Sequence, residues 1–381
     1  MRRDGGPLAG LRVLELAGFG AIGMAAMTLA GLGADVVRLE RPDDPHPSRR
    51  TDPLLRDRRR VAADLKTQEG LTAALELAAS ADVVLEALRP GVCERLGVGP
   101  ADCLARNPRL VYARITGWGQ EGPLSRFAGH DMNYVALTGV LRAVGRADEV
   151  PLPPLNLLGF AGSAVFGVVG ILAALREVEC TGLGQVVDAA AVDGVSLLAQ
   201  MVWSARERGE WSAARESNTS DGGAPFNNTY ACADGEFISV AAIEPAFYAR
   251  LLDGLGLTGE NLPDRRDKAN WPLLRERFTE VFATRTRDDW AATFAGVDAC
   301  VVPVLSFDEA AAHAHLAARA TIIRPGGVPQ AAPAPRFSRT PTPWPKPARD
   351  VETAGDVLKD WRVDEAAGQR VARGHECHAP R

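Results

Sequence analysis

Short apolar runs alternate with helical patterns near the start of the chain, and this alternation limits the possible folds more than any other feature. Leu11–Leu16 is typical of a buried strand, Ala21–Leu32 of a helix, and Asp35–Leu39 of a second buried strand. A strand, a helix and a strand in this order give two parallel strands joined by a crossover. The same alternation continues further on, with a helix at Thr67–Ser80 and strands at Asp82–Glu86 and Leu110–Ile115. We therefore expect an α/β fold whose large domain has a Rossmann-like, doubly wound parallel sheet.

The second half of the chain indicates a smaller domain of a different kind. A long helical pattern runs from Ala189 to about Arg208. After it, a polar, turn-rich segment, Glu216–Pro225, precedes a short strand at Phe237–Ala242 and several helical patterns. Prolines recur from Pro325 to Pro347, which favours an extended linker over the surface. We expect a large domain over residues 1–200, a linker over 201–224, a small α+β domain over 225–320, and a return segment over 321–381 that packs on the large domain.

Length and charge favour a small-molecule ligand. The 381 residues include 46% hydrophobic positions, enough to bury a large core in more than one domain. The net charge of -5 argues against binding to nucleic acid or to a membrane surface. Leu155–Leu175 carries no charge and is long enough to cross a bilayer. Its many glycines, and the prolines before it, favour a buried helix from about Gly162 to Leu175 instead.

Export and metal binding are not indicated. Arg2 and Arg3 are followed by Pro7 without an apolar signal segment, so we expect a cytoplasmic protein. The six cysteines form no Cys-x-x-Cys pair, and the histidines near the end of the chain lie in patterns typical of a helix surface and a frayed tail, so we expect no metal site.

A glycine motif follows the first strand and admits two interpretations. Gly18, Gly20 and Gly23 form a GxGxxG pattern at a helix start, and Glu40 ends the next strand, where an acid would bind a ribose. This pattern is typical of NAD-dependent dehydrogenases. The same glycines also permit a helix to pack closely on a strand. Glu40 is followed at once by Arg41 and Pro42, and other motifs along the chain disfavour the dinucleotide interpretation.

These other motifs resemble the alpha-methylacyl-CoA racemases, a branch of the class III CoA-transferase (CaiB/BaiF) family. They are spread over most of the chain and lie at Pro7–Gly18, Gly33–Pro42, Ala63–Lys66, Arg89–Val92, Gly117–Pro123, Gly129–Tyr134 and Ala242–Pro245. The resemblance implies a large domain that binds coenzyme A and an interlocked homodimer. It also implies that each active site lies where the large domain of one subunit meets the small domain of the other.

The resemblance also implies which residues bind the coenzyme. Its phosphates require cations and a backbone that can approach closely. The matching positions are Arg41, Ala63, Lys66, Leu88, Arg89 and Arg95, with Phe19 near the pantetheine. The basic run Arg56, Arg58, Arg59 and Arg60 has two interpretations, an additional attraction for phosphate or an exposed charged face.

The resemblance assigns the proton transfer to His130 in the Gly-His-Asp motif. Removing the weakly acidic alpha proton of a thioester requires a base tuned near neutral pH and stabilisation of the enolate oxygen. An imidazole suits the first task, and Glu244 would orient the ring and stabilise its charged form. Asp131 and Tyr134 would help to place the thioester. The expected chemistry requires no cofactor, because coenzyme A enters as part of the substrate.

The chain departs from this family at one catalytic position. Racemisation requires a second group on the opposite face of the alpha carbon, and the resembled family uses an aspartate shortly after a Pro-Pro-x-Asn-Leu motif. Here no aspartate lies between Asn156 and Leu175, and the residue is interpreted as deleted between Gly159 and Phe160. The same aspartate is the nucleophile of the transferases that share the fold, so its absence disfavours CoA transfer.

Three interpretations follow from the missing aspartate. In the first, water or a hydroxyl such as that of Tyr134 or Ser163 replaces it weakly, which gives a slow or one-sided epimerase. In the second, the enolate is used differently, as in an acyl-CoA isomerase or lyase of specialised metabolism. In the third, catalysis is lost and the protein binds or carries a CoA thioester.

Overall fold

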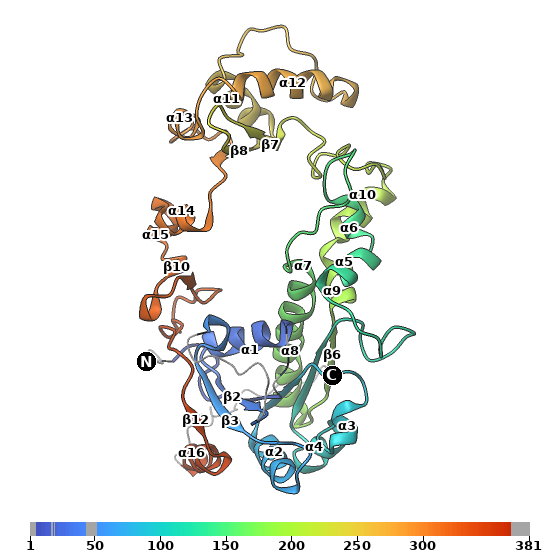
Figure 1. Ribbon diagram of the computed structural model, residues 1–381, viewed down its shortest axis with the longest axis vertical. Helices are drawn as coiled ribbons and strands as arrows, with labels where there is room; N and C mark the ends of the chain where they lie inside the picture. Colours follow the sequence, from blue (N-terminus) through green and yellow to red (C-terminus); the bar gives the residue numbers. More distant parts are fainter. Residues whose placement is uncertain (1–4, 17, 19, 43–51, 367–381) are drawn as a thin grey trace, which may run out of the picture. The chain divides into compact units, whose positions relative to one another are not determined.

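The chain forms two compact units in a computed structural model that describes residues 5–16, 18, 20–42 and 52–366 (Figure 1). The first unit consists of Met1–Thr138, Leu155–Leu198 and His315–Arg381, and the second of Gly139–Pro154 and Ala199–Ala314. The chain therefore passes from the first unit to the second and back more than once.

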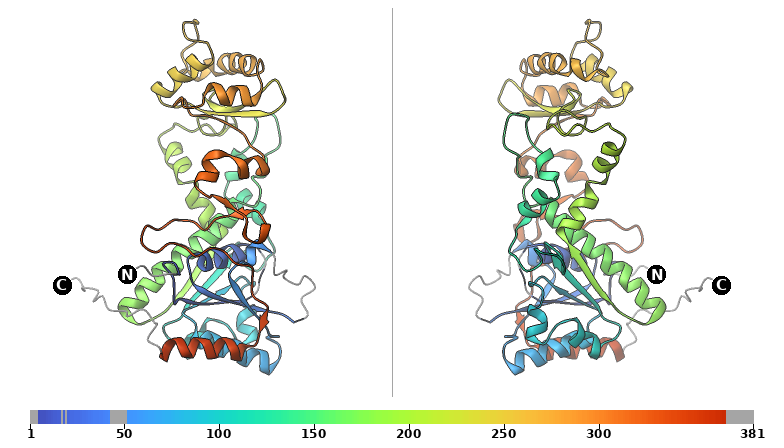
Figure 2. Two further views of the ribbon diagram at one scale, coloured as in Figure 1. Left: turned by 90° about the vertical axis from the view of Figure 1, so that its left-hand side faces the viewer. Right: turned by 90° about the vertical axis from the view of Figure 1, so that its right-hand side faces the viewer.

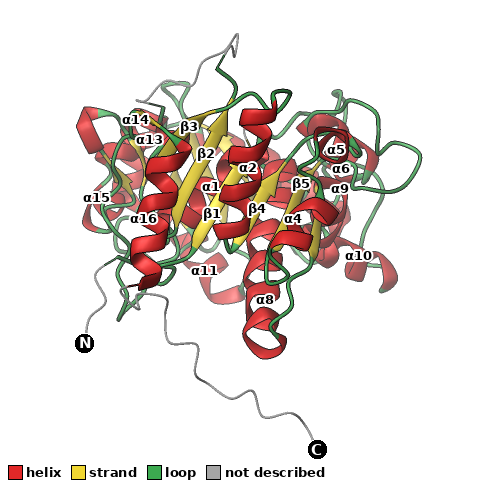
Figure 3. Ribbon diagram, turned by 90° about the horizontal axis from the view of Figure 1, so that it is seen from below, coloured by secondary structure: helices red, strands yellow, loops and turns green. Residues whose placement is uncertain are grey.

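A parallel sheet forms the centre of the first unit. Its strands, in spatial order, are β12 (Val351–Glu352), β3 (Arg58–Ala62), β2 (Asp35–Glu40), β1 (Arg12–Leu16), β4 (Val83–Glu86), β5 (Val111–Thr116) and β6 (Val186–Ala190). Every neighbouring pair is parallel, and several of the strands are seen side by side in Figure 3. The expected doubly wound parallel sheet is confirmed. Strand order reverses between β1 and β4, where such folds place their ligands.

Helices cover both faces of this sheet. Leu14, Val37 and Val84 point to the face covered by α2 (Gln68–Ser80), α4 (Pro100–Arg106) and α16 (Ala354–Ala366). Val13, Val36 and Val83 point to the other face, covered by α1 (Ala21–Gly31) and α8 (Phe166–Thr181). In the side views of Figure 2 the red α16 and the dark blue α1 lie on opposite sides of the sheet. The neighbours along each strand alternate between the two cores, as the pleat requires.

The remaining elements of the first unit are short or lie at its loops. They are η1 (Pro53–Leu55), α3 (Val92–Leu96), α5 (Asp131–Leu137), α7 (Leu158–Phe160), a π-helical turn η2 (Ala161–Val165), α9 (Ala191–Leu198), β10 (Ile322–Ile323), η4 (Pro325–Gly327) and β11 (Gln330–Ala331). The expected long helix over Ala189–Arg208 is two helices, α9 and α10 (Gln200–Glu207), which are interrupted at Ala199.

The basic run near residue 58 is largely buried and ion-paired, so the interpretation as an exposed charged face was wrong, whereas an attraction for phosphate stays a prediction. Arg58 is fully buried on β3; its Nε lies 3.2 Å from Glu15 Oε2, and its Nη2 donates to the Gly23 carbonyl at 2.6 Å. Arg59, also buried, pairs with Glu352 and Asp360 on the opposite face. Arg56 is buried and donates to Gln330 and Ala331, and Arg60 pairs with Glu40. A buried charge is tolerated when it is paired and hydrogen-bonded in this way.

Within the part of the chain that the structure describes, one helix is long and apolar enough to cross a membrane by length and composition alone. It runs without interruption through α7, η2 and α8, from Leu158 to Thr181. Its Gly167 lies against Ile115 of β5, and a Cβ at that position would lie 2.4 Å from the Ile115 Cδ1. The helix packs on the sheet as the expected buried helix does, and it is longer at both ends.

The second unit is built around a small antiparallel sheet. Its strands are β7 (Asn227–Ala231), β8 (Phe237–Ala241) and β9 (Val301–Pro303), with β8 in the middle. Tyr230, Ile238, Leu251, Phe278 and Trp290 are core residues between this sheet and its helices. The helices are α6 (Val140–Ala143), α10, α11 (Pro245–Gly254), η3 (Lys268–Asn270), α12 (Trp271–Phe282), α13 (Arg287–Thr293) and α14 (Phe307–Ala312), and α15 (Ala314–Ala318) spans the boundary.

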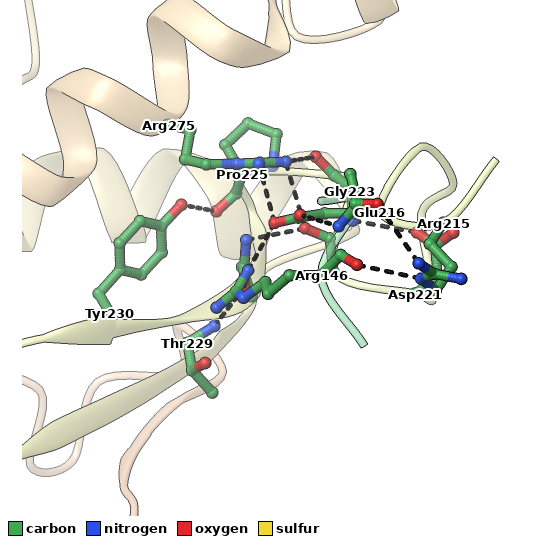
Figure 4. A network of polar contacts seen from close by, with 12 residues as sticks. Arg146, Arg215, Glu216, Asp221, Gly223, Pro225, Thr229, Tyr230 and Arg275 are labelled. Carbon is green, nitrogen blue, oxygen red and sulfur yellow. Dashed lines mark hydrogen bonds and ion pairs between the residues drawn. The ribbon is translucent and has the colours of Figure 1, made fainter. Parts of the chain in front are cut away.

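Gly139–Pro154 belongs to the second unit, whereas the sequence placed it in the large domain. A polar network holds this segment there (Figure 4). Glu216 accepts hydrogen bonds from Arg146, from Arg275 and from the Ala147 backbone N–H. Arg215 donates to main-chain carbonyls of the segment, including that of Arg146 at 3.0 Å. The partners lie about seventy positions apart, so a local sequence pattern could not reveal them.

Candidate active site

The residues assigned to the coenzyme follow the carboxyl ends of the parallel strands in the first unit. Arg41 directly follows β2, Ala63 directly follows β3, and Leu88 comes shortly after β4. The carboxyl ends of parallel strands meet at one edge of a sheet, where α/β proteins bind their ligands. Gly18, after β1, lies close to the loop after β4, because a Cβ at Gly18 would be 3.3 Å from that of Ala87. The structure therefore brings these loops to one edge of the sheet, and the loops after β1 and β4 lie where the strand order reverses.

The charged members of this set are exposed. Arg41, Lys66, Arg89 and Arg95 have exposed side chains, whereas Ala63 is buried and Leu88 half-buried. Phe19 lies outside the described residues. An arrangement of exposed cations beside a close-packed backbone suits a phosphate-bearing ligand, and the role of each of these residues stays a prediction.

The glycines after β1 have packing and conformational roles. Gly20 has a φ of +83°, which favours glycine, and a Cβ there would lie 3.4 Å from the Phe160 ring. A Cβ at Gly23 would have nothing within 4 Å. The carboxylate of Glu40 is buried and bound by Arg60 and Arg38, so a ribose hydroxyl would have to compete with two guanidinium groups. The geometry gives the NAD interpretation no support.

Two of the resembling motifs pack together around one aromatic ring. A Cβ at Gly117 would lie 1.9 Å from Tyr134 Cζ, and one at Gly129 would lie 2.7 Å from Tyr134 Cε1. Trp118 meets the same ring edge to face, with the ring centroids 4.7 Å apart. The Tyr134 hydroxyl donates a hydrogen bond to the Gly129 carbonyl. Only glycine fits at the two positions, and the packing fixes the loop that leads into His130.

His130 lies at the N-terminus of α5 with its side chain exposed. Its backbone N–H donates to Asn133 Oδ1 at 3.0 Å, and its carbonyl accepts from the Asn133 backbone N–H at 2.8 Å. The start of α5 is therefore closed by Asn133, and the imidazole extends from a rigid position at the end of the packed loop.

The next residue, Asp131, is buried at 2% exposure. Its Oδ2 accepts from the Phe160 backbone N–H at 2.8 Å, whereas its Oδ1 is buried without a hydrogen-bond partner. Burial raises the pKa of Asp131, and hydrogen bonds from the backbone of Phe160 and Gly159 oppose this rise. Burial, followed by the charge of Asp131, raises the pKa of Tyr134. Asp131 thus ties the His130 loop to the start of the long apolar helix.

The position of the missing aspartate lies against this carboxylate. A Cβ at Gly159 would be 2.5 Å from Asp131 Oδ2, so only glycine fits there. The Ser163 hydroxyl donates to the Gly159 carbonyl at 3.0 Å, and Ser163 is buried. The hydroxyls of Ser163 and Tyr134, which the sequence offered as substitutes for the aspartate, both donate to main-chain carbonyls.

Glu244 belongs to the second unit, where it starts α11. It is exposed, its carbonyl accepts from the Tyr248 backbone N–H at 3.0 Å, and its side chain makes no capping hydrogen bond. The turn before it is held from two sides, because the Ala242 N–H donates to the Phe226 carbonyl at 2.8 Å and the Ala242 carbonyl accepts from Arg265 at 3.0 Å.

Residues 8–353 match the model of CoA-transferase family III. The chain belongs to CoA-transferase family III. It is 47% identical over 359 residues to the alpha-methylacyl-CoA racemase of Mus musculus, with 93% of both chains covered. It is 44% identical to that of Homo sapiens over 83% of this chain and 82% of the relative. Among solved structures, a CAIB/BAIF family protein from Brucella suis matches 94% of this chain and 99% of its own, with a TM-score of 0.80 and 26% identity.

Family III membership confirms the resemblance recognised from the sequence motifs. The racemase relatives, which match most of the chain, also confirm the expected enzyme class, an isomerase of the racemase type. The roles of His130, Asp131 and Glu244 are not decided by these matches and stay predictions.

A buried ion cluster beside the loop that follows β4 in this family III chain was not predicted from the sequence. Glu86 ends β4 at 2% exposure, and its Oε2 accepts from the Leu88 backbone N–H at 2.7 Å. Its Oε1 lies 3.3 Å from Arg114 Nε, and Arg114 also pairs with Glu94 on α3. Burial raises the pKa of Glu86 to about 7, while the Leu88 N–H and Arg114 oppose the rise. A charged residue that ends an apolar strand was the only available signal.

Proposed function

We propose that this chain binds an acyl-CoA thioester and removes the proton from the alpha carbon of a 2-methylacyl group, as an alpha-methylacyl-CoA racemase does. The observation that carries the proposal is the 47% identity to a racemase over 93% of the chain, together with the packing of the Gly117 and Gly129 motifs around Tyr134. That packing presents an exposed imidazole, His130, at the N-terminus of α5.

In the proposed reaction His130 takes the alpha proton, and Glu244 orients the imidazole and stabilises the charged form that results. Asp131 holds the His130 loop against the helix that starts at Leu158. The coenzyme would be bound by Arg41, Ala63, Lys66, Leu88, Arg89 and Arg95 at the edge of the sheet, with Phe19 near the pantetheine. No cofactor takes part in this scheme. The cytoplasmic location also stays a prediction.

Because the aspartate is missing, two alternatives to an epimerase are kept, an acyl-CoA isomerase or lyase and a protein that only binds CoA thioesters. No aspartate or glutamate lies between Asn156 and Leu175, and the two nearby hydroxyls donate to carbonyls. A one-sided epimerase, in which one face of the enolate is served by His130 and the other by water, accounts for this site. An acyl-CoA isomerase or lyase that uses the same enolate is the alternative, followed by a protein that only binds CoA thioesters.

Deuterium uptake from heavy water tests the proposal. Each enantiomer of 2-methylbutanoyl-CoA is incubated with the protein, and exchange and inversion are followed by mass spectrometry and chiral analysis. Exchange that is faster in one enantiomer than in the other, and is abolished in His130→Ala but not in His313→Ala, supports the one-sided reaction. Equal rates from both enantiomers would show that an efficient second acid exists. No exchange, with coenzyme A still bound in calorimetry, would overturn alpha-proton abstraction on this substrate.

We also propose that the protein is an interlocked homodimer. On the long apolar helix, Val165, Val169 and Leu172 are 45%, 54% and 37% exposed and recur at the spacing of one helix face. An exposed apolar stripe of this kind on a helix supports an interface with a second subunit. Light scattering coupled to size-exclusion chromatography would overturn the proposal if the mass stays near 40.5 kDa at micromolar concentration.

A further inference from the structure

Glu244 extends from a short turn, and an exposed carboxylate on such a turn needs external support to hold one position. The turn follows β8, and its Ile243 is exposed. Misplacing a catalytic group by about 1 Å can cost a factor on the order of 100 in rate. The contacts that hold Ala242 and the first turn of α11 therefore bear directly on the chemistry proposed for Glu244.

Arg265 makes such contacts on both sides of Glu244. Its Nη1 donates to the carbonyl of Ala242, two residues before Glu244, at 3.0 Å. Its guanidinium lies over the ring of Tyr248, four residues after Glu244, at 4.2 Å, and over the ring of Phe226 at 4.7 Å. A guanidinium that lies over two aromatic rings gains cation–π attraction. Because the group is planar and rigid, the side chain loses little conformational freedom when these contacts form.

Arg265 is itself held in place. Its carbonyl accepts a hydrogen bond from the Trp271 indole N–H at 2.7 Å, and its side chain is half-buried. Phe226 and Trp271 meet edge to face, with the ring centroids 6.0 Å apart. Arg265 is therefore held in the loop that follows Leu262, and its guanidinium connects this loop to the turn before α11.

The charges near Arg265 also involve Glu244. Burial lowers the pKa of Arg265, whereas electrostatic interactions with Tyr248, Asp264 and Glu244 raise it and the charge of Arg266 lowers it. The carboxylate of Glu244 is thus among the groups that favour the charged form of Arg265, beside the contacts of Arg265 with the Ala242 carbonyl and the Tyr248 ring.

We propose that Arg265 is a positioning residue for Glu244. It fixes the turn at Ala242 and the first turn of α11, so that the carboxylate points in one direction. This inference rests on the proposed role of Glu244 in proton transfer. It concerns contacts inside the second unit and adds no step to the chemistry.

Three variants test the inference on the full-length protein. Arg265→Met removes the charge and the hydrogen bond, Arg265→Lys keeps the charge, and Arg266→Met is the matched control, because the Arg266 side chain is 86% exposed and pairs with Asp264. We expect Arg265→Met to lower the kcat of deuterium exchange into 2-methylbutanoyl-CoA by about 10-fold or more, with KM changed less than about twofold. Arg265→Lys should restore part of kcat, and Arg266→Met should leave both constants unchanged.

A double-mutant cycle separates positioning from general support of the fold. If Arg265 acts through Glu244, Arg265→Met in a Glu244→Gln background should lower kcat no further. An equal loss in both backgrounds, or a change in KM alone, overturns the inference. Glu244→Gln with wild-type exchange would instead overturn the proposed role of Glu244. If Arg265→Met does not fold, Arg265→Lys takes over the test, and a kcat equal to that of the wild type refutes the inference.

Discussion

Replacing Glu86 by glutamine should stabilise the protein at pH 8. Glu86 is buried at the end of β4, and burial raises its pKa from 4.5 to about 7. Between these two values the folded chain keeps a proton that the unfolded chain has lost, so stability falls as the pH rises from about 4.5 to about 7. Glutamine is neutral at every pH and avoids this loss, while its side-chain oxygen can still accept from the Leu88 N–H.

The magnitude follows from the two pKa values. Their difference of about 2.5 corresponds to about 3 kcal/mol. The free energy of unfolding of Glu86→Gln should exceed that of the wild type by about 1 kcal/mol at pH 5 and by about 3 kcal/mol at pH 8. Urea titrations of both proteins at several pH values between these limits would measure the difference.

Glu94→Gln is the matched control, because Glu94 pairs with the same Arg114 but its side chain is 44% exposed. The ion pair with Arg114 lowers the pKa of Glu94 although its partial burial opposes this, so its replacement should give no stabilisation at pH 8. A difference between wild type and Glu86→Gln that is constant from pH 5 to pH 8, or a Glu86→Gln variant that is less stable at pH 8, would refute the reasoning.

Five further substitutions test other parts of the structure. Gly117→Ala places a Cβ 1.9 Å from Tyr134 Cζ and should lower the free energy of unfolding by about 2 kcal/mol or more. Gly23→Ala in α1 places a Cβ with no other atom within 4 Å and should raise the free energy of unfolding by about 0.5–1 kcal/mol. Thermal unfolding measures both changes. Arg58→Met leaves the buried Glu15 short of one partner and should cost about 3 kcal/mol, with coenzyme A affinity in calorimetry unchanged within about twofold. Arg89→Ala should show the reverse, weaker coenzyme binding at unchanged stability. Val169→Glu puts a charge on the exposed apolar stripe and should shift the mass in light scattering from dimer to monomer, and an unchanged dimer would exclude this face from the interface.

Local periodicity was sufficient for most of the first unit. The runs at Leu11–Leu16 and Leu110–Ile115 are mostly apolar, which favours strands buried on both faces, and β1 and β5 lie there. The charged residues within these runs, Arg12, Glu15 and Arg114, are buried as well. The elements that the sequence did not reveal have mixed patterns. β3 consists largely of arginines, and α9 and α10 read as one helix because nothing polar separates them. Motifs identified the family, because several short matches at the right spacing outweigh one glycine pattern.

For the candidate site, too, some features could be predicted from the sequence and others depend on the tertiary structure. The sequence alone indicated that His130, Asp131 and Glu244 are candidate catalytic residues, that the strands are parallel, and that a carboxylate is missing after Asn156. Only the tertiary structure decided that Arg58 and Arg59 are buried ion-pair partners, that Asp131 binds the backbone of Phe160, and that Arg265 supports the turn before Glu244. The physical reason is that hydrophobic periodicity is a property of neighbouring residues. The cost of burying a charge, by contrast, depends on partners that lie tens to hundreds of positions away, and only the folded chain brings them together.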